Sequence, residues 1–369
     1  MSFKIIEKIM SNLDRTIKEE DLGNPYFKDK RYNTIPIEAK NFKQIELADV
    51  DLKIGFIDGG NQEIIGAPIF SIQANRVYHC IFKGQQRLDQ NSLSNRIEFF
   101  TVSTSEMKKS GIFYNTAVFP MKNEHQTFLP NETDLSFDSF DKTLRFGQQR
   151  AEIANVASMG RRFAEWSYAV HVVNKELKEK DVIVLDKTLQ TAYANESKYS
   201  NKLYDSALKK RVIVAGLSKS SRLYTDTGLS LIGAIRKFSE DNVKFKSWYV
   251  PIAEITMTDH DAVIFIVKLH PNADYVFRFE ICRKHYSELS EDDLHKIFLQ
   301  LAKNSCDVSF PGYPYGLIDA DNFARVGEAD VDSYKYMMFS RLAKNGKWDK
   351  FARHIRAIDA HDILNKLIR

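Results

Sequence analysis

The chain has 369 residues, 43% of them hydrophobic, and a formal net charge of +4. This length allows one elaborated domain or two ordinary ones with a sizeable core, and a near-neutral charge neither indicates nor excludes nucleic-acid binding. Three widely spaced cysteines exclude a disulfide framework and a zinc knuckle, and the sequence has neither a signal peptide nor an uncharged apolar stretch long enough to span a membrane. We therefore expect an intracellular, cytoplasmic protein with no membrane segment.

Residues 3–20 carry apolar side chains at helical spacing, followed by a polar connection up to about residue 48. We expect a helix that leans on the main domain. Its apolar side is a candidate surface for dimerisation or for a partner.

The next apolar run, from Leu52 to Ile57, is typical of a strand and ends in Asp58. Gly59 and Gly60 permit the backbone of a tight turn, so we expect the first half of a hairpin here. A carboxylate at a buried strand end needs a cation, hydrogen bonds or a metal. Asp58 therefore either caps the turn or binds a ligand. An antiparallel meander should follow, with strands at 64–73, 77–83, 96–103 and 111–119.

Residues 121–141 have no clear period and are interpreted as a loop or lid, and 144–177 form the longest predicted helix. The run 181–186 is typical of a buried strand and ends in a second carboxylate, Asp186.

Further predicted elements complete the chain. We expect a strand at 211–216 that opens into a loop with Lys219, a hairpin from 262–269 and 275–281, a helix at 291–304, a Pro/Gly-rich approach at 310–321, and a wholly helical tail at 329–369. Residues 341–369 carry eight Lys or Arg against three Asp, which is a net +5. This tail could line a DNA channel or dock an acidic partner, or it is an amphipathic helix with a solvated basic face.

The order of these elements resembles a ribonuclease H-like fold, an α/β mixed sheet flanked by helices. In that fold an aspartate from the first strand lies beside one from the fourth, with a glutamate from the first helix between them. Such a trio supplies hard oxygen ligands for two divalent ions. Asp58 and Asp186 fit the aspartates, and the long helix offers Glu152 and Glu165 for the glutamate.

The two glutamates are thirteen residues apart and therefore roughly 140° apart around a helix, so only one can serve. Glu165, in apolar surroundings, is preferred. Alternatively, Glu152 is a favourable charge at a helix N-terminus, and Glu165 pairs with Arg161 on a solvated face.

Five short blocks then carry a closer resemblance. They are 56–60 (FIDGG), 161–165 (RRFAE), 184–189 (VLDKTL), 215–220 (AGLSKS) and 312–321 (GYPYGLIDAD). Together and in this order, the blocks resemble the NurA nuclease family over roughly residues 50–330.

The resemblance implies a homodimeric, manganese-dependent DNA nuclease, with Mg²⁺ as the alternative metal. It implies a 5′–3′ exonuclease or single-strand endonuclease that acts on single-stranded or end-bearing double-stranded DNA. The partner would be a HerA-type hexameric translocase ATPase, in DNA end processing for recombinational repair at the nucleoid.

Residue by residue, the resemblance implies that Asp58, Glu165 and Asp186 hold the metal, and that Tyr313 matches the family tyrosine. Asp321 stands where the family often has histidine; it can ligate a metal but cannot replace a histidine that donates a proton. Gly60 replaces a serine.

Lys187 and Thr188 replace Gly-Ser after the second aspartate, and the sequence does not decide whether Lys187 contacts the scissile phosphate or points away.

Lys219 is a candidate phosphate contact, or an ordinary surface lysine on a turn. Tyr313 assists at the cut site or is a packing anchor, and Asp321 beside it is a candidate catalytic residue.

The nine histidines form no metal pair at useful spacing and are interpreted as structural or solvent-facing.

Two other functions compete with a nuclease. An actin-like ATPase or sugar kinase would need a second glycine-rich phosphate loop, which residues 205–330 do not offer convincingly. A degenerate, non-cleaving adaptor of the translocase is compatible with Lys187 and Asp321. The predicted division is a helical extension at 1–48, a nuclease domain at 49–328 and a basic helical extension at 329–369.

Overall fold

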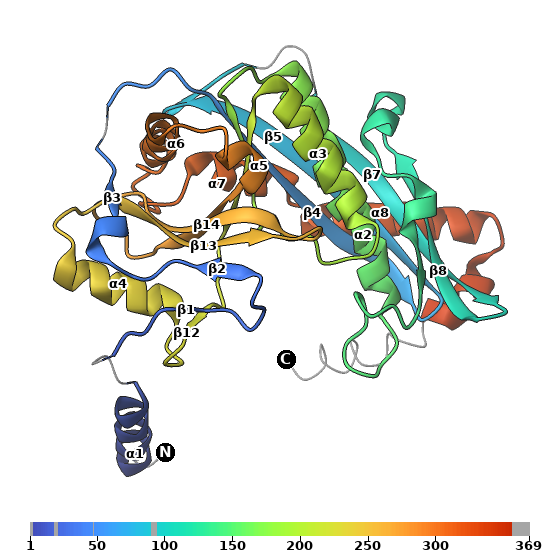
Figure 1. Cartoon of the computed structure of the whole chain (residues 1–369). Coiled ribbons are helices and arrows are strands. Elements are labelled where there is room, and N and C mark those ends of the chain that lie inside the picture. Colours follow the sequence, from blue (N-terminus) through green and yellow to red (C-terminus); the bar gives the residue numbers. More distant parts are fainter. Residues whose placement is uncertain (1–2, 18–20, 47, 90–93, 356–369) are drawn as a thin grey trace.

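The computed structural model describes residues 3–17, 21–46, 48–89 and 94–355 of the protein. These residues are organised around a mixed sheet of 13 strands. The strand order is β2-β13-β14-β15-β11-β10-β4-β5-β7-β8-β9, with β3 added to β13 and β6 to β5. Strand β10 runs parallel to both β4 and β11, whereas the other neighbours are antiparallel. The predicted α/β class with a mixed sheet is therefore confirmed (Figure 1).

The strands of this sheet are β2 (Tyr32–Thr34), β3 (Lys43–Gln44), β4 (Ile54–Ala67), β5 (Phe70–Lys83), β6 (Gln86–Arg87), β7 (Arg96–Lys108), β8 (Gly111–Pro120), β9 (Ser136–Asp138), β10 (Val182–Leu185), β11 (Ile213–Ser218), β13 (Trp248–Thr256), β14 (Asp261–Lys268) and β15 (Phe277–Cys282). A separate pair joins β1 (Pro25–Tyr26) to β12 (Tyr224–Thr225).

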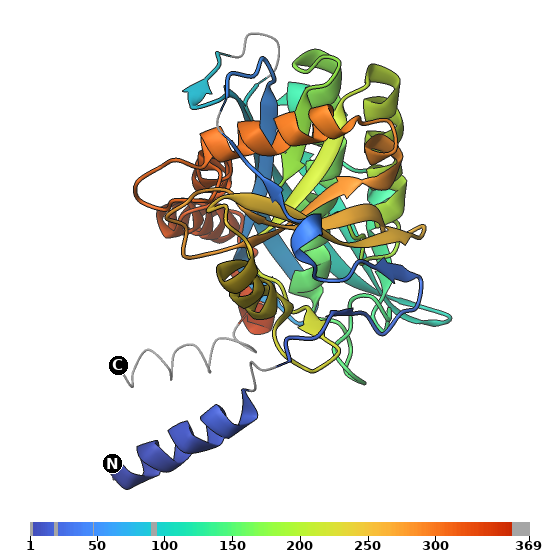
Figure 2. The ribbon, with the colours of Figure 1, turned by 60° about the vertical axis from the view of Figure 1, so that its left-hand side comes forward.

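Helices lie on both faces of the sheet. The α-helices are α1 (Phe3–Thr16), α2 (Ile153–Lys175), α3 (Glu196–Lys210), α4 (Leu231–Asn242), α5 (Arg283–Tyr286), α6 (Glu291–Asn304), α7 (Tyr315–Ala324) and α8 (Glu328–Lys344), and the 3₁₀ helices are η1 (Ala39–Asn41), η2 (Asn123–Phe128) and η3 (Glu132–Leu135). Figures 1 and 2 show this arrangement from two sides. Within the described residues, no helix combines the length and apolar composition needed to cross a bilayer.

Alternating side chains of the central strands feed two separate cores, because successive residues of a strand point to opposite faces. Ile57 and Leu185 pack with α2 and α3 in one core. Phe56, Val184 and Leu217 pack with α6 and α7 in the other. We call these the α2 face and the α7 face. Along β4, β10 and β11, odd-numbered and even-numbered positions therefore point to different faces, and we call this alternation the parity of a residue. It also determines the face reached by the side chains that directly follow each strand.

The predicted turn at Gly59 and Gly60 is wrong, because β4 continues through both glycines to Ala67 and the connection to β5 lies at residues 68–69. Neither glycine has a positive φ. They are required for space instead: a Cβ on Gly59 would overlap Glu165 and Arg161, and one on Gly60 would overlap the backbone of Ala324. The strand predicted at 64–73 is therefore divided: residues 64–67 end β4, and residues 70–73 begin β5, which also contains the strand predicted at 77–83.

The helix predicted for 144–177 begins only at Ile153, because Leu144 and Ala151 belong to an irregular segment that packs into the α2-face core. The predicted loop at 121–141 is ordered by η2, η3 and β9. The helix at 291–304 and the hairpin of β14 and β15 are confirmed.

The two terminal predictions need correction. Helix α1 buries no residue and projects away from the rest of the molecule in Figures 1 and 2, so it does not lean on the main domain. The tail is not one continuous helix, because residues 345–347 interrupt it after α8 and helix resumes at 348–355. Residues 356–369 of the predicted tail lie outside the described residues. The proposed domain division stays a prediction, although β2 and β3, from the first 48 residues, pair with β13.

Candidate metal centre

Three neighbouring strands bring their functional side chains to one place on the α7 face. Asp58 shares the parity of Phe56 on β4, Asp186 directly follows β10 with the parity of Val184, and Lys219 directly follows β11 with the parity of Leu217. Because β4, β10 and β11 are parallel, with Leu185 opposite Ile57 and Gly216, Asp186 lies level with Asp58, and Lys219 lies two residues further along on the same face. The sequence prediction that Asp58 and Asp186 meet at strand ends is thus confirmed in position, though Asp58 lies within β4.

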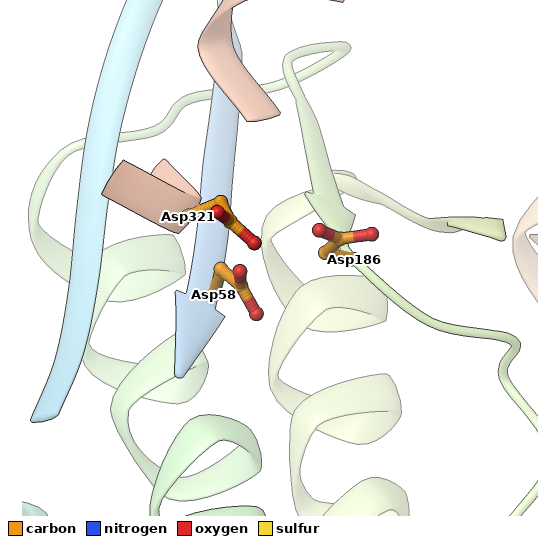
Figure 3. A group of neighbouring side chains, drawn as sticks. All are labelled: Asp58, Asp186 and Asp321. Carbon is orange, nitrogen blue, oxygen red and sulfur yellow. The ribbon is translucent and has the colours of Figure 1, made fainter. Parts of the chain in front are cut away.

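A third carboxylate, Asp321, reaches the same place from α7. One carboxylate oxygen from each of Asp58, Asp186 and Asp321 lies within 4.8 Å of the other two, and Figure 3 shows the three side chains. Each side chain is only partly buried. Hard carboxylate oxygens grouped at this spacing fit a divalent cation such as Mn²⁺ or Mg²⁺.

Lys219 lies against this cluster. Its Nζ is 2.6 Å from Oδ2 of Asp186 and 3.0 Å from Oδ1 of Asp321. Lys219 is an exposed lysine that follows a strand, as the alternative interpretation stated, and its ammonium also supplies positive charge to two carboxylates that belong to different elements. Its role as a phosphate contact remains a prediction.

Tyr313 precedes α7 and contacts the cluster from another side. Its hydroxyl donates a hydrogen bond to Oδ1 of Asp186 at 3.3 Å, and its ring packs against Phe277. Tyr313 is thus a packing anchor and a hydrogen-bond partner of the site at the same time, so the two sequence interpretations are compatible.

The electrostatics of the cluster favour an added cation. Burial raises the pKa of Asp58 to about 8, with further contributions from the charges of Asp186 and Glu165. Burial also raises the pKa of Asp186, against the opposing effect of Lys219. For Asp321, burial is outweighed by Lys219 and Arg325, and its pKa falls below the usual value. Lys219 is shared by Asp186 and Asp321, and Arg325 pairs with Asp321 alone at 3.1 Å, so the cluster around Asp58 is incompletely neutralised. A divalent cation would relieve the mutual repulsion of the three carboxylates.

Glu165 lies on the opposite, α2 face, and is 4% exposed. Oε1 accepts from Arg161, and Oε2 lies 2.6 Å from Nζ of Lys187. Burial alone would raise the pKa of Glu165, but the charges of Lys187 and Arg161 hold it below the usual value. The predicted i, i+4 pair with Arg161 exists, yet it is buried rather than on a solvated face.

The sequence model of the NurA domain matches residues 52–326, which is most of the chain. The chain belongs to the NurA family.

Among solved structures, the NurA nuclease from Sulfolobus solfataricus is 15% identical, with a TM-score of 0.49 and coverage of 94% of this chain and 99% of that chain. Two structures of Argonaute from Aquifex aeolicus are 12% and 10% identical, with TM-scores of 0.26 and 0.28; each match covers 76% of this chain and 29% of the Argonaute. No curated protein matches the sequence.

In this NurA-family chain, Lys187 points away from the carboxylate cluster. Its Nζ lies 4.3 Å from the centre of the Trp166 ring, besides its ion pair with Glu165. The path of the chain at this point depends on Gly216 of β11, because a Cβ there would overlap the carbonyl oxygen of Lys187. Lys187 has the parity of Leu185, which directs it to the α2 face. Its place after Asp186 could have indicated this from the sequence.

The NurA-family site therefore differs in one respect from the predicted ligand set. The structure brings Asp58, Asp186 and Asp321 together, whereas Glu165 binds two basic side chains across the sheet. Glu165 as a metal ligand remains a prediction. Glu152 is exposed and directly precedes α2. This position agrees with its interpretation as a favourable charge at a helix N-terminus.

Proposed function

We propose that this NurA-family protein is a metal-dependent nuclease that hydrolyses phosphodiester bonds in DNA. The observation that carries the proposal is the convergence of Asp58, Asp186 and Asp321, from β4, from the end of β10 and from α7, with their oxygens within 4.8 Å. In this proposal the three aspartates hold Mn²⁺ or Mg²⁺. Divalent ions in such sites activate water and stabilise the leaving oxygen of the phosphodiester.

The chain's own side chains have separate tasks. Lys219 lies beside the cluster, partly exposed, and its ammonium can neutralise a non-bridging oxygen of the phosphate once the aspartates are occupied. Tyr313 orients Asp186 through its hydroxyl. Burial, with the Asp186 charge, raises the pKa of Tyr313, so this hydroxyl stays protonated at neutral pH and can keep donating.

In this scheme Glu165 does not hold the metal but positions the strand segment that carries Asp58. It packs against Gly59, next to Asp58, and is held by Arg161 and Lys187. To act as a metal ligand, as the sequence predicts, it would have to release Arg161 or Lys187.

The nuclease assignment is tested with end-labelled single-stranded and double-stranded DNA, each with Mn²⁺, Mg²⁺ or a chelator. Native protein should cut only with a divalent ion, and Asp58→Asn or Asp186→Asn should abolish cutting while circular dichroism stays native. Asp241→Asn is the matched control, since Asp241 pairs with Lys237 on the exposed surface of α4. Native-level cleavage by folded Asp58→Asn protein would refute the proposal.

A non-cleaving adaptor is distinguished by the same assay. Such a protein would bind DNA with no cleavage under any divalent ion. Asp321 and Lys187, where the family often has histidine and glycine, are the departures that keep this alternative open.

The family also suggests partners, which we propose for this chain without further support from its site. These are DNA ends, a second copy of the chain and a HerA-type hexameric ATPase in the cell interior. Co-elution of the purified protein with such an ATPase in size-exclusion chromatography, with light scattering to give the stoichiometry, tests these assignments. Separate elution would argue against the complex.

A further inference from the structure

Glu165 is enclosed by two cationic side chains, and one of them is anchored to the sheet. Its two carboxylate oxygens are divided between Arg161 and Lys187, and its side chain is 5% exposed. Nε of Arg161 also donates to Oδ1 of Asn61 on β4 at 3.1 Å, and Nδ2 of Asn61 donates to Oε1 of Gln73 on β5 at 2.7 Å. Arg161 is therefore tied to β4 as well as to Glu165.

The second cation, Lys187, is fixed from other directions. Its side chain is 12% exposed, and its ammonium lies over the ring of Trp166, which is fully buried. The backbone that follows is held too, because the N–H of Leu189 donates to Oε2 of the buried Glu280 at 2.7 Å. An ammonium that contacts both a carboxylate and an aromatic ring in a buried layer is stabilised by both. Lys187 is thus a permanent counter-ion of Glu165.

The position of Glu165 makes this pairing relevant to the metal centre. Glu165 lies against Gly59, the residue after Asp58. Two divalent ions in one site are about 3.5–4 Å apart, and the second ion needs ligands of its own. Within the described residues, the three aspartates form the one group of at least three potential ligands. Glu165 could add a ligand for a second ion only if it left its two cations.

Charge balance also favours a single ion. The three aspartates and Glu165 supply four carboxylates, and four cationic side chains pair with carboxylates of this set: Arg161, Lys187, Lys219 and Arg325. With all eight side chains ionised, the formal charge is zero before metal binds. One divalent ion raises it to +2, and a second would raise it to +4, of which a bound phosphodiester offsets one. Repulsion therefore opposes a second ion.

We propose that Lys187 holds Glu165 out of the metal centre, so that this centre takes a single divalent ion. This inference rests on the nuclease function proposed above and adds the number of ions in its site. Lys187 is a positioning residue here, because it acts through Glu165.

The test counts metal ions without DNA, so that it does not depend on cleavage. Full-length protein is titrated with Mn²⁺, and electron paramagnetic resonance measures the free ion and the spectrum of the bound ion. Native protein should bind one Mn²⁺ per chain with the spectrum of an isolated ion. Two spin-coupled Mn²⁺ ions in the native protein would overturn the proposal, because ions that share a site are close enough to couple.

The variant Lys187→Met removes the charge and keeps an unbranched side chain against Trp166. It should bind a second Mn²⁺ per chain, seen as a doubled stoichiometry and as coupling between the two spins, because Glu165 is then left with Arg161 alone. Lys187→Gln, a second neutral variant, repeats the test without depending on the packing of methionine. A single ion in both folded variants would overturn the role of Lys187.

Three further variants locate the effect. Lys187→Arg keeps the charge and should stay at one ion. The double variant Lys187→Met with Glu165→Gln should return to one ion, because the freed carboxylate is gone, and a second ion there would contradict the proposal. Lys237→Met is the matched control, since Lys237 pairs with Asp241 on the exposed surface of α4, and it should bind one ion as the native protein does.

The cleavage assay separates this inference from the proposed function. One Mn²⁺ in the native chain and two in Lys187→Met, with no cleavage of any DNA, would retain the single-ion centre and reject the nuclease. Metal-dependent cleavage by a native protein that holds two ions would retain the nuclease and reject the role of Lys187. A native protein that binds no divalent ion would refute both.

Discussion

The ammonium of Lys219 lies 2.6 Å from the carboxylate of Asp186, and the two residues directly follow the parallel neighbours β11 and β10. The same ammonium reaches Asp321 at 3.0 Å. A lysine therefore neutralises part of the cluster that we propose to bind metal. Cation binding and the position of this lysine must be coupled, because both compete for the same oxygens.

Replacing Lys219 with methionine should tighten metal binding and weaken DNA cleavage. Removing a unit positive charge about 4 Å from an incoming divalent cation relieves a repulsion of ~2 kcal/mol in water and ~8 kcal/mol at the dielectric typical of a protein surface, so affinity should rise at least about tenfold. The phosphate contact is lost in the same variant. Isothermal titration with Mn²⁺ and a cleavage assay measure the two effects, and weaker metal binding would show that Lys219 supports the site rather than competing for it.

Glu165→Gln should destabilise the protein by about 3–5 kcal/mol, because Arg161 and Lys187 would be left as buried cations without a counter-charge. Urea unfolding gives the free energy. The control is Glu240→Gln, which removes the same i, i+4 arginine–glutamate pair from an exposed position beside Arg236 and should cost about 0.5 kcal/mol or less. Equal losses in the two variants would contradict this account of Glu165.

Gly59→Ala should cost about 1–3 kcal/mol in stability, because its new methyl group overlaps Glu165 and Arg161 in a packed layer. Gly233→Ala, inside α4, has its nearest neighbour at 3.7 Å and should be neutral or stabilising by up to about 1 kcal/mol. Thermal and urea unfolding of both variants compare them. A Gly59→Ala protein as stable as the native one would mean that α2 can move away from β4 at no cost.

The stability of the protein should fall as the pH is lowered from 6.5 towards 4, in part because of His79. Burial lowers the pKa of His79 from 6.5 to about 4. Between these values the unfolded chain binds a proton at this histidine and the folded chain does not, so acid favours unfolding, by an amount on the order of 3 kcal/mol below pH 4.

The variant His79→Leu should lose this contribution. Its Tyr168 partner keeps a second acceptor, the carbonyl oxygen of Ser94. Unfolding free energies measured at a series of pH values should therefore fall less steeply between pH 6.5 and 4 in the variant than in the native protein. Parallel curves for the two proteins would exclude His79 as the source.

The sequence identified several features of this protein correctly, because they depend on local patterns. Continuous apolar runs predicted the buried strands before Asp186 and Lys219, and helical spacing predicted α6. The ordered short blocks indicated the family, which the NurA domain match over residues 52–326 confirms.

Other features depended on contacts between distant segments, and local patterns misled there. Gly59 and Gly60 are typical of a turn, yet they continue a strand because α2 and the segment around Ala324 pass too close for side chains. Helix α1 has an apolar stripe, but nothing in the sequence states whether the rest of the chain covers it, and in the structure none of its residues is buried.

The amino-acid sequence by itself indicated the family, the mixed sheet and the meeting of Asp58 with Asp186, because apolar runs mark the strands that carry or precede these aspartates and because the order of elements and short blocks resembles a known fold and family. Only the tertiary structure decided the third carboxylate. Asp321 reaches Asp58 and Asp186 because α7 packs on the same face, whereas Glu165 is on the other face of the sheet and its charge is taken up by Arg161 and Lys187. The face on which a helix packs is set by long-range burial of apolar surface, which no short stretch of sequence records.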